Sequence, residues 1–591
     1  MQSENKNCQN CKASFTIEPD DFSFYEKIKV PSPTFCPECR LVRRLLMRNE
    51  RTLYKRKCDL CNEEKILVFP KESKYKVYCH DCFYSDNWDG QTDGQDYDFS
   101  KTFFEQYIKL YDSVPRLGIA KQGFNVNSEY VNRASDTKNC YLIFASNDNE
   151  DCYYGVSYWG SKNCMDCYNV RKCERCFECL DCYKCNGLKY SKECNECLDS
   201  YFLNNCRNCQ NCFGCTNLRN KNYCIFNKQY AREEYLEKIS EFRIYSRAEL
   251  EKIAERVRKE SLNYIVPCIV EHHSVNVSGN WIENSKNVNN SFNCDKVEDG
   301  KYLLGVQQAK DVMDYTYWGN GSELIYETSS VGRQCSSVLF SNESWDQLVR
   351  AEYCVNCFSS SDLFGCVGLR KKQYCILNKQ YSKEEYETMI QKIKEQMKNM
   401  PFLDNAGRTI SYGEFFPCDM LPFAYNESIA QEYFPKTKEE IIVQGYRWKE
   451  PDTKNYVPTV LSSELPSSIN LVSDHILNEI IACAHGGRCN QQCTTAFKII
   501  PNELQFYRAN NIPPPQLCPN CRYYERLLKH QPFKLWPRAC MCDPTLESYD
   551  GQSRINHLHG KEKCDIEFKT SYAPDRSEIV YCEKCYQQEV Y

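Results

Sequence analysis

The sequence predicts a mainly β, multidomain chain with two tandem β-solenoids and capping helices, flanked at both ends by small cysteine-paired modules. Three observations lead to this fold class. Sixteen cysteines between Cys140 and Cys224 recur at spacings that are multiples of three residues. C-x-x-C pairs gather in the first ninety and the last hundred residues. A segment at 213–230 returns, closely similar, at 364–381, which indicates an internal duplication.

The cysteine repeat has a period of three, which is neither the helical period of 3.6 nor the strand period of 2. It therefore indicates that one residue in three points into a common interior. The residues between are mostly polar or aromatic and suit an outer surface. The cysteines with this spacing are Cys140, Cys152, Cys164, Cys167, Cys173, Cys176, Cys179, Cys182, Cys185, Cys194, Cys197, Cys206, Cys209, Cys212, Cys215 and Cys224.

The same positions also recur at twelve, as in Cys140, Cys152, Cys164 and Cys176. Stacked coils of a solenoid lie about 4.8 Å apart, and each coil covers the inner face of its neighbour. Coil lengths of 12, 18 or 24 residues all fit the pattern. The sequence thus predicts a narrow β-solenoid over residues 125–230, with its handedness open.

Three interpretations of these thiols compete. Reduced cysteine is a small buried residue that fills a narrow core. Alternatively, facing columns of thiols bind zinc or an iron–sulfur cluster; the run Cys173–Cys185 is similar to the start of a bacterial ferredoxin motif but lacks its final C-x3-C-P. A disulfide ladder is disfavoured, because the N-terminus has no secretory signal and no stretch is apolar enough to span a membrane. We expect a cytoplasmic protein.

Residues 1–90 carry four C-x-x-C pairs. Each pair presents two thiolates to one ion, and two pairs complete a tetrahedral site with no open position, which is typical of structural zinc. Sequential pairing predicts two sites, formed by Cys8, Cys11, Cys36 and Cys39, and by Cys58, Cys61, Cys79 and Cys82.

The first block, Cys8-Gln-Asn-Cys11 followed by Cys36-Pro-Glu-Cys39-Arg40, resembles a bacterial zinc-ribbon family of unknown role. The second block resembles small ribbons that end in a Val-Tyr-Cys-x-x-Cys knuckle, here Val77–Cys82. The whole layout is similar to Cys-rich bacterial proteins in which terminal zinc-ribbon, treble-clef-like domains flank a Cys-lined solenoid. This resemblance implies zinc at the ends and implies no activity.

The remaining segments follow from local patterns. The predicted segments are a linker and short helix at 91–124 (helix around Phe99–Tyr111), capping or docking helices at 231–264 with a break near Tyr245, a second solenoid at 265–381, a capping helix at 382–400, and a connector at 401–480 anchored by Trp448 and Tyr456 with a helix near Ser473–Cys483. The second solenoid has far fewer cysteines and uses Ser, Val, Leu and Ala instead. If the coil forms without most thiols, the thiols serve packing first.

The last segment, residues 481–591, repeats the opening module. The predicted zinc ligands here are Cys489, Cys493, Cys518, Cys521, Cys540, Cys542, Cys564, Cys582, Cys585, His557 and His559. Either Cys540 or Cys542 completes the last site, and one of the two histidines joins or substitutes. Cys483 and His485 are spare potential ligands beside the third site. We therefore expect about four structural zinc ions, two at each end.

No nucleotide-binding, zinc-protease or serine-hydrolase motif is present, and eight histidines leave little room for a histidine-based active site. The sequence favours a non-enzymatic binding scaffold whose ribbons recognise RNA or a nucleoprotein assembly. Basic residues near the ribbons motivate this partner. The candidate phosphate contacts are Arg40, Arg43, Arg44, Arg48, Arg51, Arg56, Arg522 and Arg526.

A solvated helix face is the alternative role for these arginines. The alternative function is storage or handling of zinc or iron–sulfur clusters by the solenoid thiols. Redox catalysis by C-x-x-C thiols is a third hypothesis, but it needs an electropositive setting that acidic residues around Cys173–Cys185 do not offer. The oligomeric state stays open.

Overall fold

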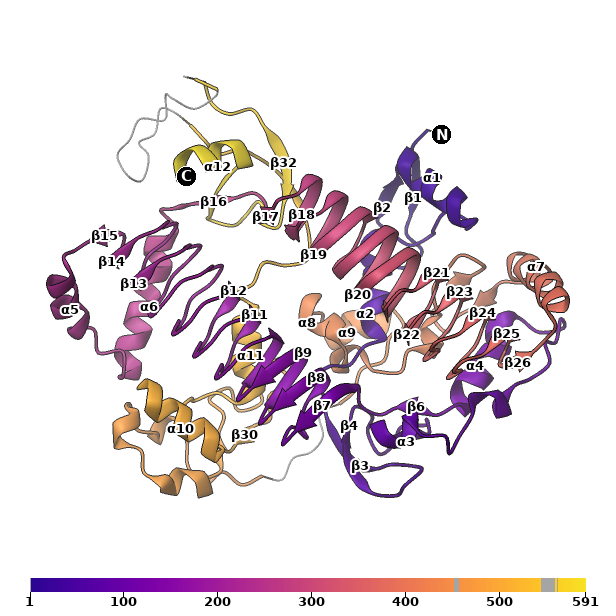
Figure 1. The fold of residues 1–591 in the computed structure, drawn as a ribbon, viewed down its shortest axis with the longest axis horizontal. Helices are drawn as coiled ribbons and strands as arrows, with labels where there is room; N and C mark the ends of the chain where they lie inside the picture. Colours follow the sequence, from indigo (N-terminus) through magenta and orange to yellow (C-terminus); the bar gives the residue numbers. More distant parts are fainter. Residues whose placement is uncertain (1, 451–455, 544–558, 561, 591) are drawn as a thin grey trace. The chain divides into compact units, whose positions relative to one another are not determined.

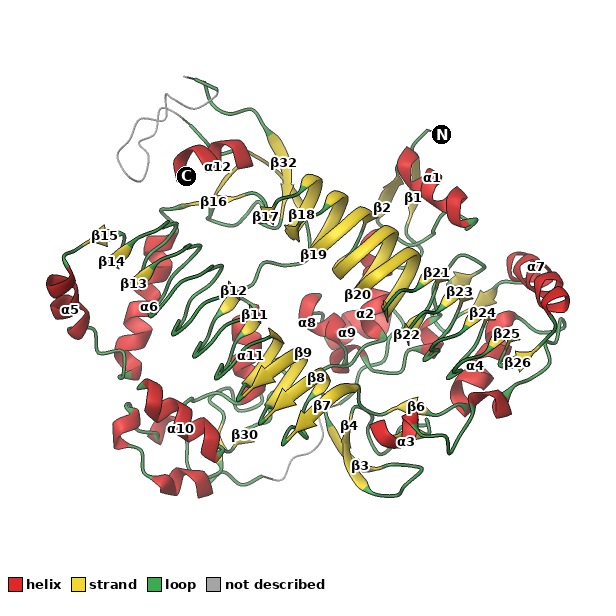
Figure 2. Cartoon of the chain, viewed as in Figure 1, coloured by secondary structure: helices red, strands yellow, loops and turns green. Residues whose placement is uncertain are grey.

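The computed structural model describes residues 2–450, 456–543, 559–560 and 562–590. It confirms the predicted fold class: the chain is mainly β, with a β-solenoid architecture of about 21 turns, 24% helix, and cysteine clusters at both ends (Figures 1 and 2). The chain divides into two compact units. Unit 1 comprises Met1–Ala120 and Ile269–Lys449, and unit 2 comprises Lys121–Cys268 and Glu450–Tyr591. The N-terminal module therefore shares unit 1 with the second solenoid, and the C-terminal module shares unit 2 with the first solenoid.

The solenoid of unit 2 advances by twelve residues per coil, which settles the coil length. Parallel pairs such as Val156 with Tyr168 and Tyr168 with Leu180 have this offset. Single bridges repeat it on every side of the coil, as at Glu174–Asn186, Phe177–Lys189 and Leu180–Lys192. Its strands are β7 (Lys121–Val126), β8 (Asn132–Lys138), β9 (Tyr141–Glu150), β10 (Tyr153–Trp159), β11 (Tyr168–Arg171), β12 (Leu180–Tyr183), β13 (Gln210–Phe213), β14 (Asn222–Ile225) and β15 (Lys228–Gln229).

Each side of a coil is one triplet of residues. The first residue, such as Cys173, points inward; the second, Glu174, bridges to the next coil; the third, Arg175, has a positive φ of 53°. The third residue, in the left-handed conformation, forms a corner between two sides of the coil. Four triplets, and therefore four corners, complete one coil of twelve residues. Asn, Asp and Gly tolerate this conformation best, which explains why Asn or Asp precedes so many of the inner cysteines.

The backbone hydrogen bonds explain why the interior prefers cysteine and serine. Glu174 N–H donates to Cys185 O in the coil ahead (2.9 Å), and Arg175 N–H donates to Lys162 O in the coil behind (3.1 Å). The N–H of an inner residue needs an acceptor inside the core. Ser161 Oγ accepts from Cys173 N (3.2 Å), and Cys167 Sγ accepts from Cys179 N (3.4 Å). A small inner side chain with a lone pair thus accepts a hydrogen bond from the backbone N–H of the inner residue in the next coil.

The solenoid of unit 1 follows the same plan with more variation. Coils of eleven residues occur at its start, as between Val275 and Lys286, and coils of thirteen in its middle, as between Ser336 and Val349. Its core is Val, Leu and Ile with fewer cysteines. Its strands are β17 (Glu271–His272), β18 (Val275–Glu283), β19 (Lys286–Lys301), β20 (Leu304–Gly332), β21 (Ser336–Leu339), β22 (Asn342–Trp345), β23 (Val349–Glu352), β24 (Ser361–Phe364), β25 (Gln373–Ile376) and β26 (Lys379–Gln380).

Both solenoids end in a short antiparallel hairpin, which the sequence analysis did not foresee. Helical segments follow both hairpins, as predicted. In unit 2 the caps are α5 (Arg232–Ser240) and α6 (Arg247–Ser261), with Tyr235 buried against Tyr223. In unit 1 the cap is α7 (Lys383–Asn399), with Tyr386 against Tyr374. The predicted break near Tyr245 lies between α5 and α6.

The terminal modules are built from short hairpins that each precede a helix. The elements of unit 1 are β1 (Glu4–Asn7), β2 (Ser14–Ile17), α1 (Pro19–Ile28), α2 (Pro37–Leu46), β3 (Tyr54–Lys57), β4 (Glu64–Leu67), β5 (Val77–Tyr78), α3 (His80–Tyr84), a 3-10 helix (Gly90–Asp93), α4 (Phe103–Ser113) and β6 (Arg116–Leu117). Those of unit 2 are β16 (Ile265–Pro267), β29 (Ile481–Ala482), β30 (Ala496–Phe497), α10 (Pro501–Asn510), α11 (Pro519–Leu527), β31 (Trp536–Ala539), β32 (Glu567–Thr570), β33 (Ile579–Tyr581) and α12 (Glu583–Val590).

The segment predicted as one connector belongs to both units. Residues up to Lys449 pack around the N-terminal module, as where Ile429 N–H donates to Arg48 O (3.1 Å). The structured pieces here are β27 (Phe402–Leu403), β28 (Thr409–Ile410), α8 (Ile429–Tyr433), α9 (Lys438–Val443) and 3-10 helices at Cys418–Met420, Tyr425–Glu427, Ser462–Glu464, Ile469–Leu471 and Asp474–Asn478.

Two expectations for this segment are wrong. Tyr456 is 60% exposed and anchors nothing, whereas Tyr425 and Tyr446 are buried against each other. The helix expected near Ser473–Cys483 is only a 3-10 turn, because β29 then pairs with β30 and leads directly into Cys483.

Candidate metal centres

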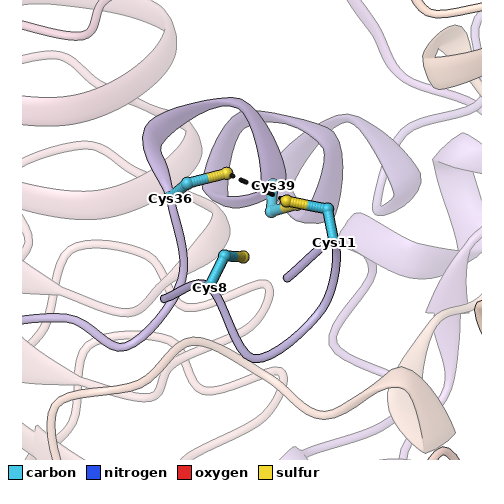
Figure 3. A group of neighbouring side chains, drawn as sticks. All are labelled: Cys8, Cys11, Cys36 and Cys39. Atoms are coloured by element: carbon cyan, nitrogen blue, oxygen red, sulfur yellow. Dashed lines mark hydrogen bonds between the residues drawn. The ribbon is translucent and has the colours of Figure 1, made fainter. Parts of the chain in front are cut away.

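Site 1 brings together the four cysteines predicted for it. Cys8 and Cys11 lie in the tight loop between β1 and β2, and Cys36 and Cys39 lie at the start of α2 (Figure 3). The Sγ atoms of Cys11 and Cys36 are 3.7 Å apart, and all four ligand atoms lie within 4.8 Å of one another. The positive end of a helix macrodipole favours thiolate at such a position.

Site 2 repeats this arrangement with Cys58, Cys61, Cys79 and Cys82. Cys79 N–H donates to Cys58 Sγ (3.2 Å) at the start of α3. Burial disfavours ionisation of Cys58, but backbone N–H groups of Cys61 and Cys79 outweigh it and lower the pKa of this thiol to about 7. The loop is therefore prepared to present thiolate at neutral pH.

Site 3 differs from the arrangement that the spacing indicated. Cys493, Cys518 and Cys521 are joined by Cys483, which the sequence analysis treated as a spare ligand. Cys518 N–H donates to Cys483 Sγ (3.3 Å), as Cys79 N–H does to Cys58. Cys483 therefore takes the place of Cys58 in site 2, and the loop from Cys483 to Cys493 is a long one.

Cys489 is not a member of that tetrad in the structure. Its Sγ lies 3.7 Å from Cys521 Sγ, and it forms a separate group with His485 and Cys521. C-x3-C spacing made Cys489 look like the partner of Cys493. Only the strand register, in which Ala482 faces Ala496, shows where the loop begins.

Site 4 consists of Cys540, Cys564, Cys582 and Cys585, all buried. Of the two alternatives left open, Cys540 joins the tetrad, and Cys582 N–H donates to its Sγ (3.2 Å). Cys542 is buried next to this group. His559 Nδ1 lies 2.6 Å from Glu562 O, and His557 lies outside the described residues.

The donor sets fit soft, tetrahedral metal coordination. Four thiolates converge in each site, and no disulfide links the cysteines of the described part of the chain. A four-thiolate set is typical of structural zinc and leaves no position for substrate. The four four-cysteine groups could therefore hold metal ions.

The arginines predicted to contact phosphate are buried and do not lie on a free surface. Arg40 and Arg44 leave α2 towards the solenoid of unit 1, where Asp314 accepts from Arg40 Nε (2.9 Å) and Arg44 Nη1 (3.1 Å). Arg43 reaches Glu327 (3.1 Å). Side-chain exposures are 7% or less for Arg40, Arg43, Arg44, Arg48, Arg51, Arg56, Arg522 and Arg526.

Unit 2 contains the same docking arrangement. Asp166 lies 3.2 Å from Arg522 Nη1 and 2.8 Å from Arg526 Nη1, both from α11. Arg522 lies over the Tyr154 ring, as Arg40 lies over Tyr302. In each solenoid, Tyr and Asp occupy successive coils at the left-handed corner position.

Burial disfavours ionisation of Asp166 and raises its pKa, although Arg522 and Arg526 oppose the shift. The arginines therefore dock a terminal module on a solenoid, and neither of the roles weighed from the sequence describes this. A recurring Tyr, Asp, Glu spacing in the two solenoids was the signal in the sequence.

The solenoid thiols are engaged with the backbone. Cys176 Sγ donates to Glu174 O (3.4 Å), and Cys179 Sγ donates to Phe177 O (3.4 Å) and Leu188 O (3.5 Å). Burial raises the pKa of Cys164 well above its usual value. The Sγ–carbonyl contacts fit S–H donors in a packed core.

Comparisons with known proteins add little. No family model matches the chain, and no curated protein matches it. Among solved structures, it is similar to a "putative acetyltransferase" from Desulfovibrio desulfuricans G20, with a TM-score of 0.10 and 10% identity over 40% of this chain and 62% of that one. A TM-score this low carries no argument about fold or function. No helix in the described ranges is long and apolar enough to cross a membrane.

Proposed function

We propose that this protein is a non-enzymatic binding scaffold in which zinc at sites 1 to 4 stabilises the terminal modules. The observation that carries the proposal is the convergence of four thiols at each of four places. Zinc is the metal that a closed four-thiolate set most commonly takes. Each module is small and relies on short hairpins, so bound zinc supplies stability that its limited core does not.

Two buried arginine–carboxylate networks support the scaffold part of the proposal. Each ties a metal-binding module to a solenoid within one unit, at Asp314 and at Asp166. Each module is thereby held against the middle coils of an extended, regular surface. Repeat proteins use such surfaces to bind macromolecules.

The experiment is zinc analysis of single-ligand variants. Cys39→Ser, Cys82→Ser and Cys582→Ser are each expected to lower the zinc content by one ion per chain relative to the wild type. Cys418→Ser is the control, since Cys418 is a half-buried thiol that lies beside Asp419. Wild-type protein without zinc, or variants that keep the full content, would contradict the proposal.

Recognition of RNA or a nucleoprotein assembly stays a prediction about the partner. The docked arginines cannot contact phosphate without separating from the solenoid. Exposed cations beside the modules, including Lys55 and Lys529, with side chains 70% and 59% exposed, would have to supply the contacts. Binding to RNA that weakens as salt rises supports this partner; absence of binding at low salt would exclude it.

Metal storage by the solenoid thiols is the second candidate. The regular columns of Cys140, Cys152, Cys164 and Cys176 favour it. The carbonyl contacts of the S–H groups favour packing instead. Stoichiometric iron, or zinc far above what the terminal cysteine groups can bind, would favour storage.

A further inference from the structure

Site 3 has more ligands than its counterpart in the N-terminal module. Site 1 is formed by four cysteines from a tight loop and a helix start. The equivalent loop of the C-terminal module, from Cys483 to Cys493, is longer and adds His485 and Cys489. His485, Cys489 and Cys521 have ligand atoms within 4.8 Å of one another, and Cys521 also belongs to the tetrad.

We propose that Cys521 bridges two zinc ions in the C-terminal module, a closed one in site 3 and a second one held by His485, Cys489 and Cys521. This second ion is additional to the four structural ions proposed above. The proposal rests on the proposed function, because it requires zinc in site 3. Its three protein ligands leave a fourth position open to water. This is the coordination of exchangeable or reactive zinc, not of a purely structural ion.

The distances support a shared thiolate. Cys521 Sγ lies 3.8 Å from Cys483 Sγ on one side and 3.7 Å from Cys489 Sγ on the other. Thiolates that share one tetrahedral zinc lie about this far apart, given a Zn–S bond of about 2.3 Å. The same sulfur is therefore placed at the edge of two adjacent coordination shells.

The histidine is oriented as a ligand. His485 Nδ1 is buried and has no hydrogen-bond partner in the described part of the chain. Its Nε2 lies 3.6 Å from Glu525 Oε1 on α11. Metal-binding histidines commonly direct the second ring nitrogen to a carboxylate, which fixes the tautomer. Nδ1 is thus the atom available to the ion.

Charge also favours the second ion. The four thiolates of site 3 around a single dication carry two uncompensated negative charges, whereas a second dication with the Cys489 thiolate leaves one. The loop can make the required turn because Gly486 and Gly487 both have positive φ (55° and 79°). In site 1, Cys8 and Cys11 are joined by only two residues, so no further ligand enters.

The test compares zinc per chain in full-length protein loaded with excess zinc and desalted. We expect five ions in the wild type, four in Cys489→Ser, and three in Cys521→Ser, which removes the bridge. Cys39→Ser is the matched control, because Cys39 is the counterpart of Cys521 in site 1; it is expected to retain four.

Chelator kinetics on the same samples provide a second measurement. One zinc per chain should leave the wild type in a fast phase that is missing in Cys489→Ser, while hydrogen exchange of α11 stays unchanged. Four ions in the wild type, or equal zinc content in wild type and Cys489→Ser, would overturn the bridge and leave the tetrads intact. Loss of no zinc in Cys39→Ser would instead overturn the proposed function.

Alkylation of the wild type needs no variant. Zinc should protect Cys489 from iodoacetamide, and chelation should expose it, whereas Cys418 should react equally in both samples. Equal labelling of Cys489 with and without zinc would also overturn the second ion.

Discussion

Asp314 is the residue whose loss should most directly separate a metal-binding module from its solenoid. Its side chain is fully buried and faces Arg40 and Arg44 at 2.9 and 3.1 Å. Asp314→Ala leaves both guanidinium groups in the interior with Glu327 as the main remaining counter-charge. Removing one partner of a buried ion pair typically costs about 3–5 kcal/mol. We expect a cost of this size for the docked state of α2.

Hydrogen exchange measured by mass spectrometry on the zinc-loaded chain tests this expectation. At 1.4 kcal/mol for each factor of ten, the cost corresponds to exchange of α2 faster by about 10²- to 4 × 10³-fold. Asp166→Ala should have the same effect on α11 and none on α2. The two carboxylates lie in different units, so each variant serves as a control for the other.

Asp311→Ala is the matched control within unit 1. Asp311 lies one triplet before Asp314, is 27% exposed, and pairs with Lys27 at 2.8 Å. A pair this exposed contributes about 0–1 kcal/mol. If α2 exchanges no faster in Asp314→Ala than in Asp311→Ala, the network does not hold the module in place and the reasoning is refuted.

Three further predictions concern the solenoid and the metal sites. Cys167→Ser should keep the stability of the wild type within about 1 kcal/mol, whereas Cys167→Val should lose about 1–3 kcal/mol in denaturant unfolding, because Cys179 N–H then lacks its acceptor; equal losses would contradict the core hydrogen-bond argument. Asn208→Val should cost about 1–2 kcal/mol because Asn208 has a φ of 50°, whereas Gln210→Val in β13 should be neutral; a neutral Asn208→Val would contradict the corner geometry. Lowering the pH from 7 to 4 should release zinc, since protons compete for the thiolate ligands, and should increase exchange in the terminal modules before the solenoids; zinc retention at pH 4 would argue against thiolate ligation.

The period of three was readable in the sequence because it reflects the smallest unit of the coil. Every inner position, such as Cys173 or Ser161, has the same spatial and hydrogen-bond requirement, so composition repeats with geometry. The coil length was open because columns separated by twelve residues hold different residues, such as Cys176 and Leu188. Backbone bridges, not side-chain identity, define that length.

The metal ligands were predictable where loops are short. C-x-x-C knuckles bring Cys8 to Cys11 and Cys58 to Cys61 by local geometry alone. Cys483 was not predicted as a ligand of site 3 because nine residues separate it from Cys493. The C-x3-C spacing favoured Cys489 as the partner of Cys493 instead. The register of β29 with β30, which closes this loop, is a tertiary property.

The arginines show a different limit. A cluster of like charges along a helix has the same composition whether it binds phosphate or buried carboxylates. Asp314 and Asp166 lie hundreds of residues from their partners in sequence, so no local pattern joins them. Only the fold distinguishes a nucleic-acid surface from an intramolecular interface.

The two docked modules differ at one position of their otherwise shared interface. The two modules share an arginine pair with the same spacing, Arg40 and Arg44 in one and Arg522 and Arg526 in the other. The position between them differs: Arg43 meets Glu327, whereas its counterpart is Glu525. In unit 2 the counterpart of Glu327 is Glu178, which pairs with Arg526 and Lys529 instead. Glu178 therefore lies near Glu525 in the native pairing, and burial together with Glu178 raises the pKa of Glu525. The two modules thus share the arginine–aspartate contact and differ in the cation that helps to neutralise the next acid of the solenoid, which is Arg43 in unit 1 and Lys529 in unit 2.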